Sequence, residues 1–380
     1  MKKIFSMALA AILAFGVTAC GSKADETTDE GNAVSEETDD ENPSGSTANA
    51  VKVGVSMPDQ TLRRWSQDGK NIKAQLEAVG YDIDVQYAGN NDVGLQVAQI
   101  ENMIDEGAQI LVIAPVEGAS LAEVLKDAKD SGIPVIAYDR LIMNSDAVTY
   151  YATFDNYKAG RLQGAYIRDA LKLDSAEGPF NIELFTVDSG DNNVNFFWAG
   201  AMDVLQPFID SGKLVVPSGQ TKLEQCVTPG AKADEAEKRM RAIIAEQGYS
   251  PSGKPLAAAL ASNDAVANGV TRALLEAGFE RASGFPIITG QDCDVASVKN
   301  ILAGTQAMSV FKDTRALAAQ VVNMVNSIAT GSPVDINDTR TYDNGAGVIP
   351  AYLCEPVNAT ADNYEALLID SGYYARNDIS

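Results

Sequence analysis

The sequence predicts an α/β fold of two lobes, each built around a parallel sheet. The chain has 380 residues, which is long enough for two domains with separate cores. From Val51 onward short apolar strands alternate with helical segments, and this alternation starts again after Phe154. Such alternation is typical of βαβ units, in which helices cover both faces of a parallel sheet.

The first lobe is predicted from four strand-like runs with helical segments between them. Runs of apolar and β-branched residues lie at 51–57, 81–88, 109–114 and 134–139. The helical patterns between them occupy 63–80, 94–107 and 120–132. Each helical pattern ends at or near a glycine suited to terminating a helix: Gly80, Gly107 and Gly132.

The second lobe repeats this organisation. Strand-like runs are expected at 180–187, 214–219 and 256–262, and helices at 195–212 and 233–247. Two segments, 110–139 and 256–292, share one order of features: strand, loop, helix, glycine, a strand led by proline, and a terminal aspartate. The two lobes are therefore predicted to have the same topology, with Asp139 and Asp292 in equivalent places.

These two aspartates indicate a ligand site between the lobes. In open α/β sheets ligands bind outside the carboxyl ends of the strands, and both aspartates are expected there. A single acid next to Arg140 could equally be a salt-bridged cap of its strand. Two pseudo-equivalent acids, each beside further polar residues, favour a binding site over two caps.

Further polar side chains collect at the predicted strand ends and in the loops that follow. They include Arg64, Arg140, Asp191, Asn192, Asn193, Asn263 and Lys312. Mixed donors and acceptors of both charges suit a neutral polyol, whereas a phosphate site would be glycine-rich and positive. A metal site would cluster acids without interleaved arginines and lysine. Trp65 offers a flat face for a sugar ring, although a core position on its helix explains it equally well.

The composition excludes several classes of function. The chain is 46% hydrophobic and 7% aromatic, as expected for a globular protein. Its 52 acids and 29 bases give a net charge of -23, which argues against nucleic acid and anionic lipid surfaces as partners. There is no histidine, so Ser-His-Asp and Cys-His catalysis and histidine-ligated zinc are excluded. Asp139 and Asp292 do not suit a glycosidase pair, because Arg140 and Lys312 favour two ionised carboxylates and leave no general acid.

The N-terminus has the features of an export signal. Lys2 and Lys3 precede an apolar run too short to span a membrane as a stable helix. The run ends in Val-Thr-Ala-Cys at Cys20, which resembles the lipobox of bacterial lipoproteins; an ordinary signal peptide with an incidental cysteine is the alternative. Residues 1–20 are thus a predicted lipoprotein signal peptide, with Cys20 carrying a lipid that anchors the mature protein.

Residues 21–50 are predicted to form an acidic, disordered tether. They contain nine acids, one lysine and no aromatic residue, so they cannot bury a core. The remaining cysteines are Cys226, Cys293 and Cys354; one pair among them is possible, but no disulfide framework is indicated.

Short motifs from Val51 to the C-terminus resemble the pentose and hexose branch of the bacterial periplasmic sugar-binding proteins. These proteins are the substrate-binding components of ABC importers. The motifs are LRRW, QIENMI, LVIAP, IAYDR, YATFDN, DNN, ASNDA, GQD, AGTQ and VFKDT. The stretches GPFNIELF, FKDTR, VNMVN and NDTRTY make the chain most similar to the multiple-monosaccharide binding members, followed by the xylose-binding members.

The resemblance implies a type I periplasmic binding protein, with two Rossmann-like lobes joined by a three-crossing hinge. The crossings would fall near 154–156, 309–313 and 345–349. The N-terminal lobe would comprise 51–154 plus 313–345, and the C-terminal lobe 155–312 plus 346–380. The implied polar contacts to sugar are Arg64, Asp139, Arg140, Asp191, Asn192, Asn193, Asn263, Asp292 and Lys312, with Trp65 stacking on the ring. No catalytic residue, metal or cofactor is implied.

One departure concerns a second stacking tryptophan that relatives usually carry. Ala231 stands about where that residue would fall, in the stretch CVTPGAKADEAEKRM. The second face of the sugar is then either left uncovered or covered by Phe196, Phe197 or Trp198.

The expected function is a lipid-anchored, extracytoplasmic receptor, most simply a monomer, that binds a monosaccharide of the xylose, glucose, galactose or arabinose type. It would deliver this sugar to an ABC permease and its ATPase, with the lipid as its only membrane contact. The alternative is a sugar-sensing protein that docks to a chemoreceptor or sensor kinase. A transcriptional repressor is disfavoured, because the chain opens with an export signal and an acidic tether.

Overall fold

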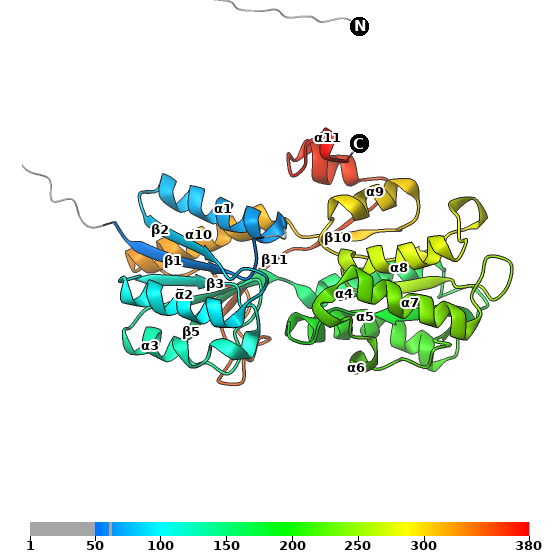
Figure 1. Ribbon diagram of the computed structural model, residues 1–380, viewed down its shortest axis with the longest axis horizontal. Helices are drawn as coiled ribbons and strands as arrows, with labels where there is room; N and C mark the ends of the chain where they lie inside the picture. The colour runs from blue at the N-terminus through cyan, green and yellow to red at the C-terminus, as the bar shows by residue number, and fades with distance from the viewer. Residues whose placement is uncertain (1–49, 61–62, 380) are drawn as a thin grey trace, which may run out of the picture. The chain divides into compact units, whose positions relative to one another are not determined.

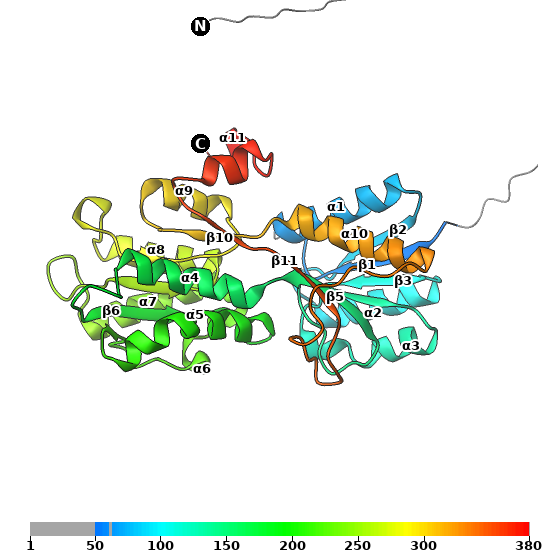
Figure 2. The ribbon, with the colours of Figure 1, turned by 180° about the vertical axis from the view of Figure 1, so that it is seen from behind.

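The computed structural model describes residues 50–60 and 63–379. The predicted signal peptide, Cys20 and nearly all of the predicted tether lie outside these residues. Within the described part, two parallel sheets form the centres of two lobes (Figures 1 and 2). The predicted α/β class with two parallel sheets is confirmed.

The first lobe contains a six-stranded parallel sheet in the order β11-β5-β4-β3-β1-β2. Its strands are β1 (Lys52–Met57), β2 (Asp82–Tyr87), β3 (Ile110–Ile113), β4 (Val135–Tyr138), β5 (Val148–Phe154) and β11 (Ala351–Cys354). Its helices are α1 (Arg63–Ala78), α2 (Val93–Asp105), η1 (Gly118–Leu121), α3 (Val124–Asp130) and α10 (Thr314–Thr330).

Helices cover both faces of this sheet, which explains why its central strands β3 and β4 are buried along their whole length. Figure 1 shows α1 and α10 on one face and α2 and α3 on the other. In β3, Ile110 and Val112 pack in the core that includes α1 and α10 residues, while Leu111 and Ile113 pack in the core that includes α2 and α3 residues. All four side chains are buried, as expected for a strand of a parallel sheet.

The second lobe contains a four-stranded parallel sheet in the order β7-β6-β8-β9. Its strands are β6 (Phe180–Phe185), β7 (Leu214–Val215), β8 (Ala258–Ala261) and β9 (Ile287–Ile288). Its helical elements are α4 (Asn156–Ala170), α5 (Asn193–Asp210), α6 (Leu223–Cys226), η2 (Pro229–Ala231), α7 (Ala233–Gln247), α8 (Asp264–Glu276), η3 (Arg281–Ser283) and α9 (Val295–Ala303). The antiparallel pair β10 (Ser309–Phe311) and β12 (Val357–Ala359) extends this lobe, because Val310 forms an isolated bridge with Gln291.

The helices α4 and α5 pack unusually closely, because glycines lie at their contact. A Cβ atom at Gly160 would lie 2.0 Å from the carbonyl oxygen of Phe197, and one at Gly200 would lie 1.9 Å from that of Tyr157. Only glycine permits this approach of two backbones. The contact matters for the site, since α4 follows the first crossing and α5 follows the polar loop at Asp191.

The chain passes between the lobes at three places, and the third differs from the prediction. It leaves the first sheet at Phe154, where Asp155 caps α4, and returns after β10, where Asp313 caps α10. The third crossing was expected near 345–349, with residues from 346 onward in the second lobe. That boundary is wrong, because β11 pairs with β5 in the first sheet, and the chain crosses only after Cys354.

The C-terminal segment completes the second lobe. After β12 it forms the π-helical turn η4 (Glu365–Asp370) and the short helix α11 (Arg376–Ile379). Leu368, Tyr374 and Ile379 pack in one core with Cys293 and Phe311. Both views show α11 beside α9 (Figures 1 and 2).

The three cysteines of the described residues are all free and buried. Burial raises the pKa of Cys226 and of Cys354 to about 11, so these thiols are protonated at neutral pH. The pairing left possible by the sequence does not occur.

Candidate functional site

The two strand-end aspartates have the same unusual backbone conformation. Asp139 follows β4 with a φ of 60°, and Asp292 follows β9 with a φ of 97°. Their main-chain N–H groups make matching bonds, from Asp139 to the carbonyl of Ala152 (2.7 Å) and from Asp292 to that of Val310 (2.8 Å). Positive φ is costly for residues other than glycine and occurs preferentially at functional sites. The structure thus places the two residues equivalently, one in each lobe.

Arg64 brings these two carboxylates together. It lies in the first turn of α1, and its Nη2 donates to the carboxylate of Asp139. Its Nη1 lies 3.9 Å from Oδ1 of Asp292, which belongs to the other lobe. Asp68, one helical turn further along α1, lies 3.8 Å from the Nε of Arg64. One guanidinium therefore links acidic groups from both lobes.

The charges around Asp139 decide its ionisation. Burial alone would raise the pKa of Asp139, but Arg64, Lys312 and Arg140 lower it more, so the net pKa lies below the usual range. Asp139 is therefore an anion at neutral pH and can accept hydrogen bonds but not donate them. A carboxylate in this state accepts strongly from hydroxyl groups.

Lys312 supplies a second cation from the crossing that follows β10. Its Nζ lies 3.1 Å from Oδ1 of Asp292, and its side chain is only 4% exposed. The ammonium lies 5.6 Å from the ring centroids of both Phe154 and Phe197. Phe197 is thus the aromatic residue of α5 that contacts a predicted site residue.

Arg140 adds a third cation beside Trp65. Its Nη1 donates to the carbonyls of Pro115 (3.3 Å) and Val116 (3.2 Å), and its Nε lies 3.7 Å from Oδ2 of Asp191 in the second lobe. Burial raises the pKa of Asp191, although Arg140 opposes this effect.

Trp65 occupies a core position. It is 2% exposed and packs with the core between α1, α10 and the first sheet. The guanidinium carbons of Arg64 and Arg140 lie 4.6 Å and 5.2 Å from its ring centroid. Of the two interpretations of Trp65, the structure favours the core residue, and the ring contributes to the site by supporting both arginines.

The asparagines of the predicted site are already engaged by protein groups. Asn193 donates from Nδ2 to the carbonyl of Asp139 (2.9 Å), and its Oδ1 lies 3.1 Å from the hydroxyl oxygen of Tyr151, so it joins the two lobes directly. Asn263 caps α8 by accepting from the N–H of Val266. Asn192 accepts from Asn195 through its side-chain oxygen.

Ala231 and the three aromatic residues that could replace the missing stacking tryptophan lie in different parts of the structure. Ala231 ends the turn η2 with a φ of 51° and packs at the edge of the second-lobe core. Phe196 packs against Tyr342, with ring centroids 4.7 Å apart. Trp198 contacts the core formed with β6 and β7. Of these four, only Phe197 contacts a cation of the site.

Several site residues were missed in the sequence. Tyr151 and Thr153, both on β5, donate from their hydroxyls to the carbonyl of Asp139 at 2.7 Å and 2.9 Å. Tyr151 and Thr153 are two residues apart in VTYYATF, a spacing that places both side chains on one face of a strand and could have identified them. Asp68 could have been found from its spacing of four residues from Arg64, which places both on one face of a helix.

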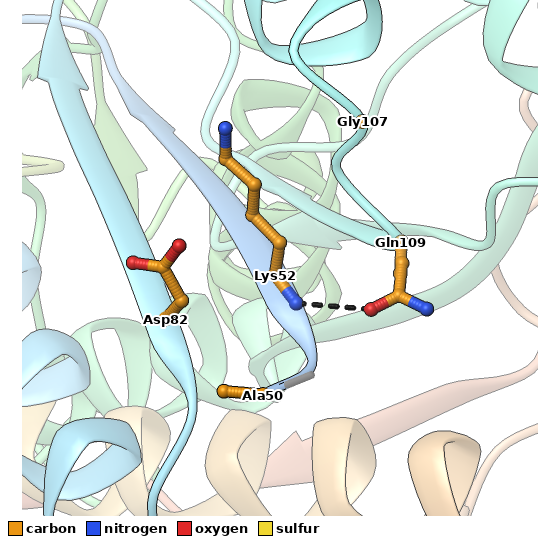
Figure 3. A pocket seen from close by; sticks show the side chains of 5 residues that line it. All are labelled: Ala50, Lys52, Asp82, Gly107 and Gln109. Carbon is orange, nitrogen blue, oxygen red and sulfur yellow. Dashed lines mark hydrogen bonds between the residues drawn. The ribbon is translucent and has the colours of Figure 1, made fainter. Parts of the chain in front are cut away.

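A shallow depression of about 460 Å³ lies elsewhere and is not a candidate site (Figure 3). It is lined by Ala50, Lys52, Asp82, Gly107 and Gln109. In it the main-chain N–H of Lys52 donates to Oε1 of Gln109 at 3.1 Å. Lys52 and Asp82 begin their strands, so the depression lies at the amino ends of the sheet, opposite the ends at which ligands bind in such folds.

Residues 50–60 and 63–379 contain neither a metal-binding cluster nor a membrane-spanning helix. In this part of the chain, no group of three or more Cys, Asp or Glu side chains could hold a metal ion. No helix among the described residues is sufficiently long and apolar to cross a membrane.

Comparisons with known proteins agree with this geometry. The family model for a periplasmic binding protein domain matches residues 53–333. A multiple sugar-binding periplasmic protein of Azospirillum brasilense is 47% identical over 323 residues, covering 85% of this chain and 89% of that protein. The D-xylose-binding periplasmic protein of Escherichia coli is 35% identical over 332 residues, covering 87% and 93%.

A solved structure is also similar over nearly the whole described part. It is an ABC transporter solute binding protein of Clostridium phytofermentans with bound β-D-glucose, 56% identical to this chain with a TM-score of 0.82. The match covers 87% of this chain and 100% of the other. The resemblance and the type I fold predicted from the motifs are confirmed, and the chain is non-catalytic like these relatives. It belongs to the periplasmic sugar-binding proteins, a branch of the periplasmic binding protein family with an extracytoplasmic location.

Proposed function

We propose that this protein binds a free aldose of the glucose or xylose type between its lobes and delivers it to an ABC permease. The observation that carries the proposal is the meeting of Asp139 and Asp292, one from each lobe, at the guanidinium of Arg64. Groups from both lobes that converge in this way can surround a ligand and hold the lobes together around it.

The balance of charge supports a neutral ligand. The cations Arg64, Arg140 and Lys312 face the carboxylates of Asp139, Asp191 and Asp292. A phosphorylated sugar would add two negative charges beside three carboxylates, at a high electrostatic cost. The site therefore suits hydroxyl groups, which accept from the cations and donate to the acids.

Polar atoms without partners support the same conclusion. The Nε atoms of Arg64 and Arg140 are buried and make no hydrogen bond with a described residue, and each has only a carboxylate at 3.8 Å or 3.7 Å beside it. An unpaired buried donor or acceptor costs about 1–3 kcal/mol, and ring hydroxyls of a sugar would remove that cost. The related proteins with glucose or D-xylose in their names bind ligands of this chemistry.

The proposed sugar contacts are made by the charged side chains of the site, which can still form hydrogen bonds with sugar hydroxyls. They are Arg64, Asp139, Arg140, Asp191, Asp292 and Lys312. Asn192, Asn193 and Asn263 each retain an amide hydrogen for a sugar oxygen, although their side-chain oxygens are engaged. The guanidinium groups of Arg64 and Arg140 lie over the ring of Trp65, so they would separate this ring from the sugar.

The permease, its ATPase and a lipid anchor at Cys20 are the further parts of this proposal. The lipid anchor is supported by the signal-like N-terminus, the cysteine at its end and the acidic stretch after it. The permease and its ATPase are supported by the similar protein described as an ABC transporter solute binding protein. Docking to a chemoreceptor or sensor kinase has no support from the geometry of the described residues.

Replacement of Cys20 by alanine should abolish labelling of the protein with a radioactive fatty acid in cells.

A thermal-shift screen tests the proposed ligand. A compound that binds only the native state raises the melting temperature, by an amount that grows with its concentration relative to Kd. D-glucose and D-xylose should raise the melting temperature of the full chain, while glucose 6-phosphate should not. A shift with phosphorylated sugars alone would overturn the proposal.

A further inference from the structure

The two strained turns that present Asp139 and Asp292 are each held by a tyrosine hydroxyl. In the first lobe Tyr151 donates to the carbonyl of Asp139 itself at 2.7 Å. In the second lobe Tyr374 donates to the carbonyl of Cys293, the residue after Asp292, at 2.9 Å. The first tyrosine lies on the neighbouring strand, whereas the second comes from the C-terminal segment.

The turn in the second lobe carries the greater strain. Asp292 and Cys293 are consecutive residues with φ values of 97° and 53°, and neither is glycine. Each such residue costs about 1–3 kcal/mol and persists only where the surroundings determine its conformation. If either residue relaxed to negative φ, the direction of the Asp292 side chain would change, and with it the distances to Lys312 and Arg64.

Hydrogen bonds hold this turn at its start and at its end. The N–H of Asp292 donates to Val310, and the N–H of Cys293 donates to the Oγ of Ser309 at 3.0 Å. These two bonds come from β10 and fix the start of the turn. At its end the hydroxyl of Tyr374 orients the carbonyl of Cys293, and the N–H of Asp294 donates to Oδ2 of Asp264 at 2.8 Å.

The segment that carries Tyr374 is itself well anchored. Tyr374 is buried in a core with Cys293, Phe311 and Leu368. Ser371, three residues earlier, accepts at its carbonyl from Nη1 of Arg315 on α10 at 2.9 Å. The segment lies beyond residue 333, where the match to the family model ends.

We propose that Tyr374 is a positioning residue for sugar binding, which acts by holding the Asp292–Cys293 turn. This inference rests on the proposed sugar-binding function. The Tyr374 hydroxyl bonds to the carbonyl of Cys293, the residue after Asp292, so we expect its effect on the ligand to pass through Asp292. Loss of the hydroxyl leaves the ring in its core but frees the carbonyl of Cys293.

A double-mutant cycle tests this role. Kd for D-glucose and for D-xylose is measured by calorimetry for the unaltered full chain, Tyr374→Phe, Asp292→Asn and the double variant. Loss of one neutral hydrogen bond predicts a Kd about three- to tenfold higher for Tyr374→Phe. In the Asp292→Asn background the same change should have almost no further effect, because the carboxylate that it positions is gone.

A matched control is Tyr364→Phe, on the same segment. The hydroxyl of Tyr364 makes no hydrogen bond in the part of the chain that the structure describes, so its removal should leave Kd unchanged in both backgrounds. Melting temperatures of all variants show whether each is folded at the temperature of the measurement.

Three outcomes would contradict the inference. An unchanged Kd for Tyr374→Phe, or an equal loss with and without the Asp292 carboxylate, would mean that the tyrosine has only a structural role. In both cases binding by the unaltered chain would leave the proposed function standing. If the unaltered chain binds neither sugar, the proposed function fails and the positioning role fails with it.

Discussion

At the scale of single residues, Asp139 has a structural ion pair in a place where we also propose a ligand contact. The residue ends its strand, and its carboxylate accepts from Arg64 inside the candidate site. A structural ion pair and a ligand contact are therefore compatible here, and only binding measurements separate their contributions.

Replacement of Asp139 by asparagine should weaken sugar binding. The amide keeps the size of the side chain but loses a charge-assisted hydrogen bond of about 1.5–3 kcal/mol, equivalent to about a ten- to hundredfold higher Kd. The melting temperature should fall too, since Arg64 loses a partner. Calorimetry with D-glucose measures the first effect and thermal unfolding the second.

The control for this change is Asp127→Asn on α3. Asp127 is exposed, away from the strand ends, so both its Kd and its melting temperature should match those of the unaltered chain. If Asp139→Asn lowers stability but leaves Kd unchanged, the aspartate is only a structural cap.

Asp68 gives a pH-dependent prediction. Burial raises its pKa to about 7, while Arg64 and the hydroxyl of Thr314 oppose the shift and Asp139 adds to it. The hydroxyl of Tyr138 also faces it, but neither carboxylate oxygen has hydrogen-bonding geometry with a described residue.

The sign follows from the binding of protons. Between pH 4 and 7 the folded chain holds a proton on Asp68 that the unfolded chain has released, so stability falls as pH rises across this range. The loss is about 1.4 kcal/mol per pH unit at most. Asp68→Asn should therefore make the urea unfolding free energy less dependent on pH between 5 and 8. The same pH dependence in both proteins would contradict the raised pKa.

The sequence could place some of these residues but not orient them. Asp139 and Asp292 were predictable because the ends of apolar strands are visible in the sequence. The buried position of Trp65 was not predictable. The sequence shows that Trp65 follows Arg64 at the start of a helix, but it does not show which side of that helix faces the core. The contact of Asn193 with Tyr151 joins residues of different lobes, and no local pattern encodes that contact.

At the scale of secondary-structure elements, the pairing of α4 with α5 fixes the polar loop at Asp191 relative to the first crossing. Asn193, the first residue of α5, bonds to the carbonyl of Asp139, so a displacement of α5 would change the contact between the lobes. The close approach at Gly160 and Gly200 is therefore expected to matter for stability.

Gly160→Ala should be strongly destabilising. Its Cβ would lie 2.0 Å from a backbone oxygen of α5, which cannot move without moving the helix. Overpacking usually costs about 1–3 kcal/mol, and a backbone obstacle predicts a loss at or above the upper end of that range. Unfolding in urea measures this loss.

Gly94→Ala in α2 is the matched control. That glycine is exposed in the first turn, and a Cβ there would lie 3.4 Å from the Oδ1 of Asp92, an ordinary contact. Alanine favours helix by about 0.5–1 kcal/mol over glycine, so this variant should be neutral or slightly more stable. Similar losses in the two variants would argue against the close packing of α4 and α5.

Two strands of the first sheet, β5 and β11, were not predicted from the sequence. β5 was not assigned because VTYYATF mixes polar and apolar residues, and β11 was not assigned because it belongs to no local βαβ unit. β11 pairs with β5 across about 200 residues of intervening chain. The assignment of β11 as a strand depends on this long-range pairing. The third crossing was therefore misplaced, whereas the strands and helices of local βαβ units were predicted.

At the scale of the whole molecule, the crossings and the site are closely connected. Lys312 lies at one crossing, and Phe154, at the end of another, lies 5.6 Å from its ammonium. Asn193 and Arg64 make further contacts between the lobes. Occupation of the site and the angle between the lobes should therefore influence each other.

Sugar binding should shift the protein towards a closed form. A ligand stabilises the conformation in which it makes more contacts, and here the charged groups that would contact it come from both lobes. Without sugar, the acids and bases of the site can instead be hydrated in a more open form. Small-angle scattering should show a smaller radius of gyration when D-glucose is added at a saturating concentration.

The Asp139→Asn variant supplies the control for closure. At a glucose concentration that saturates the unaltered chain but lies below the raised Kd of the variant, the radius of gyration of the variant should change little. At a much higher concentration the two proteins should converge, because the variant retains Asp292, Lys312 and the three crossings. If calorimetry shows saturation of the unaltered chain and its radius of gyration stays constant, the sugar binds without closing the lobes, and the groups at the crossings do not couple ligand to conformation.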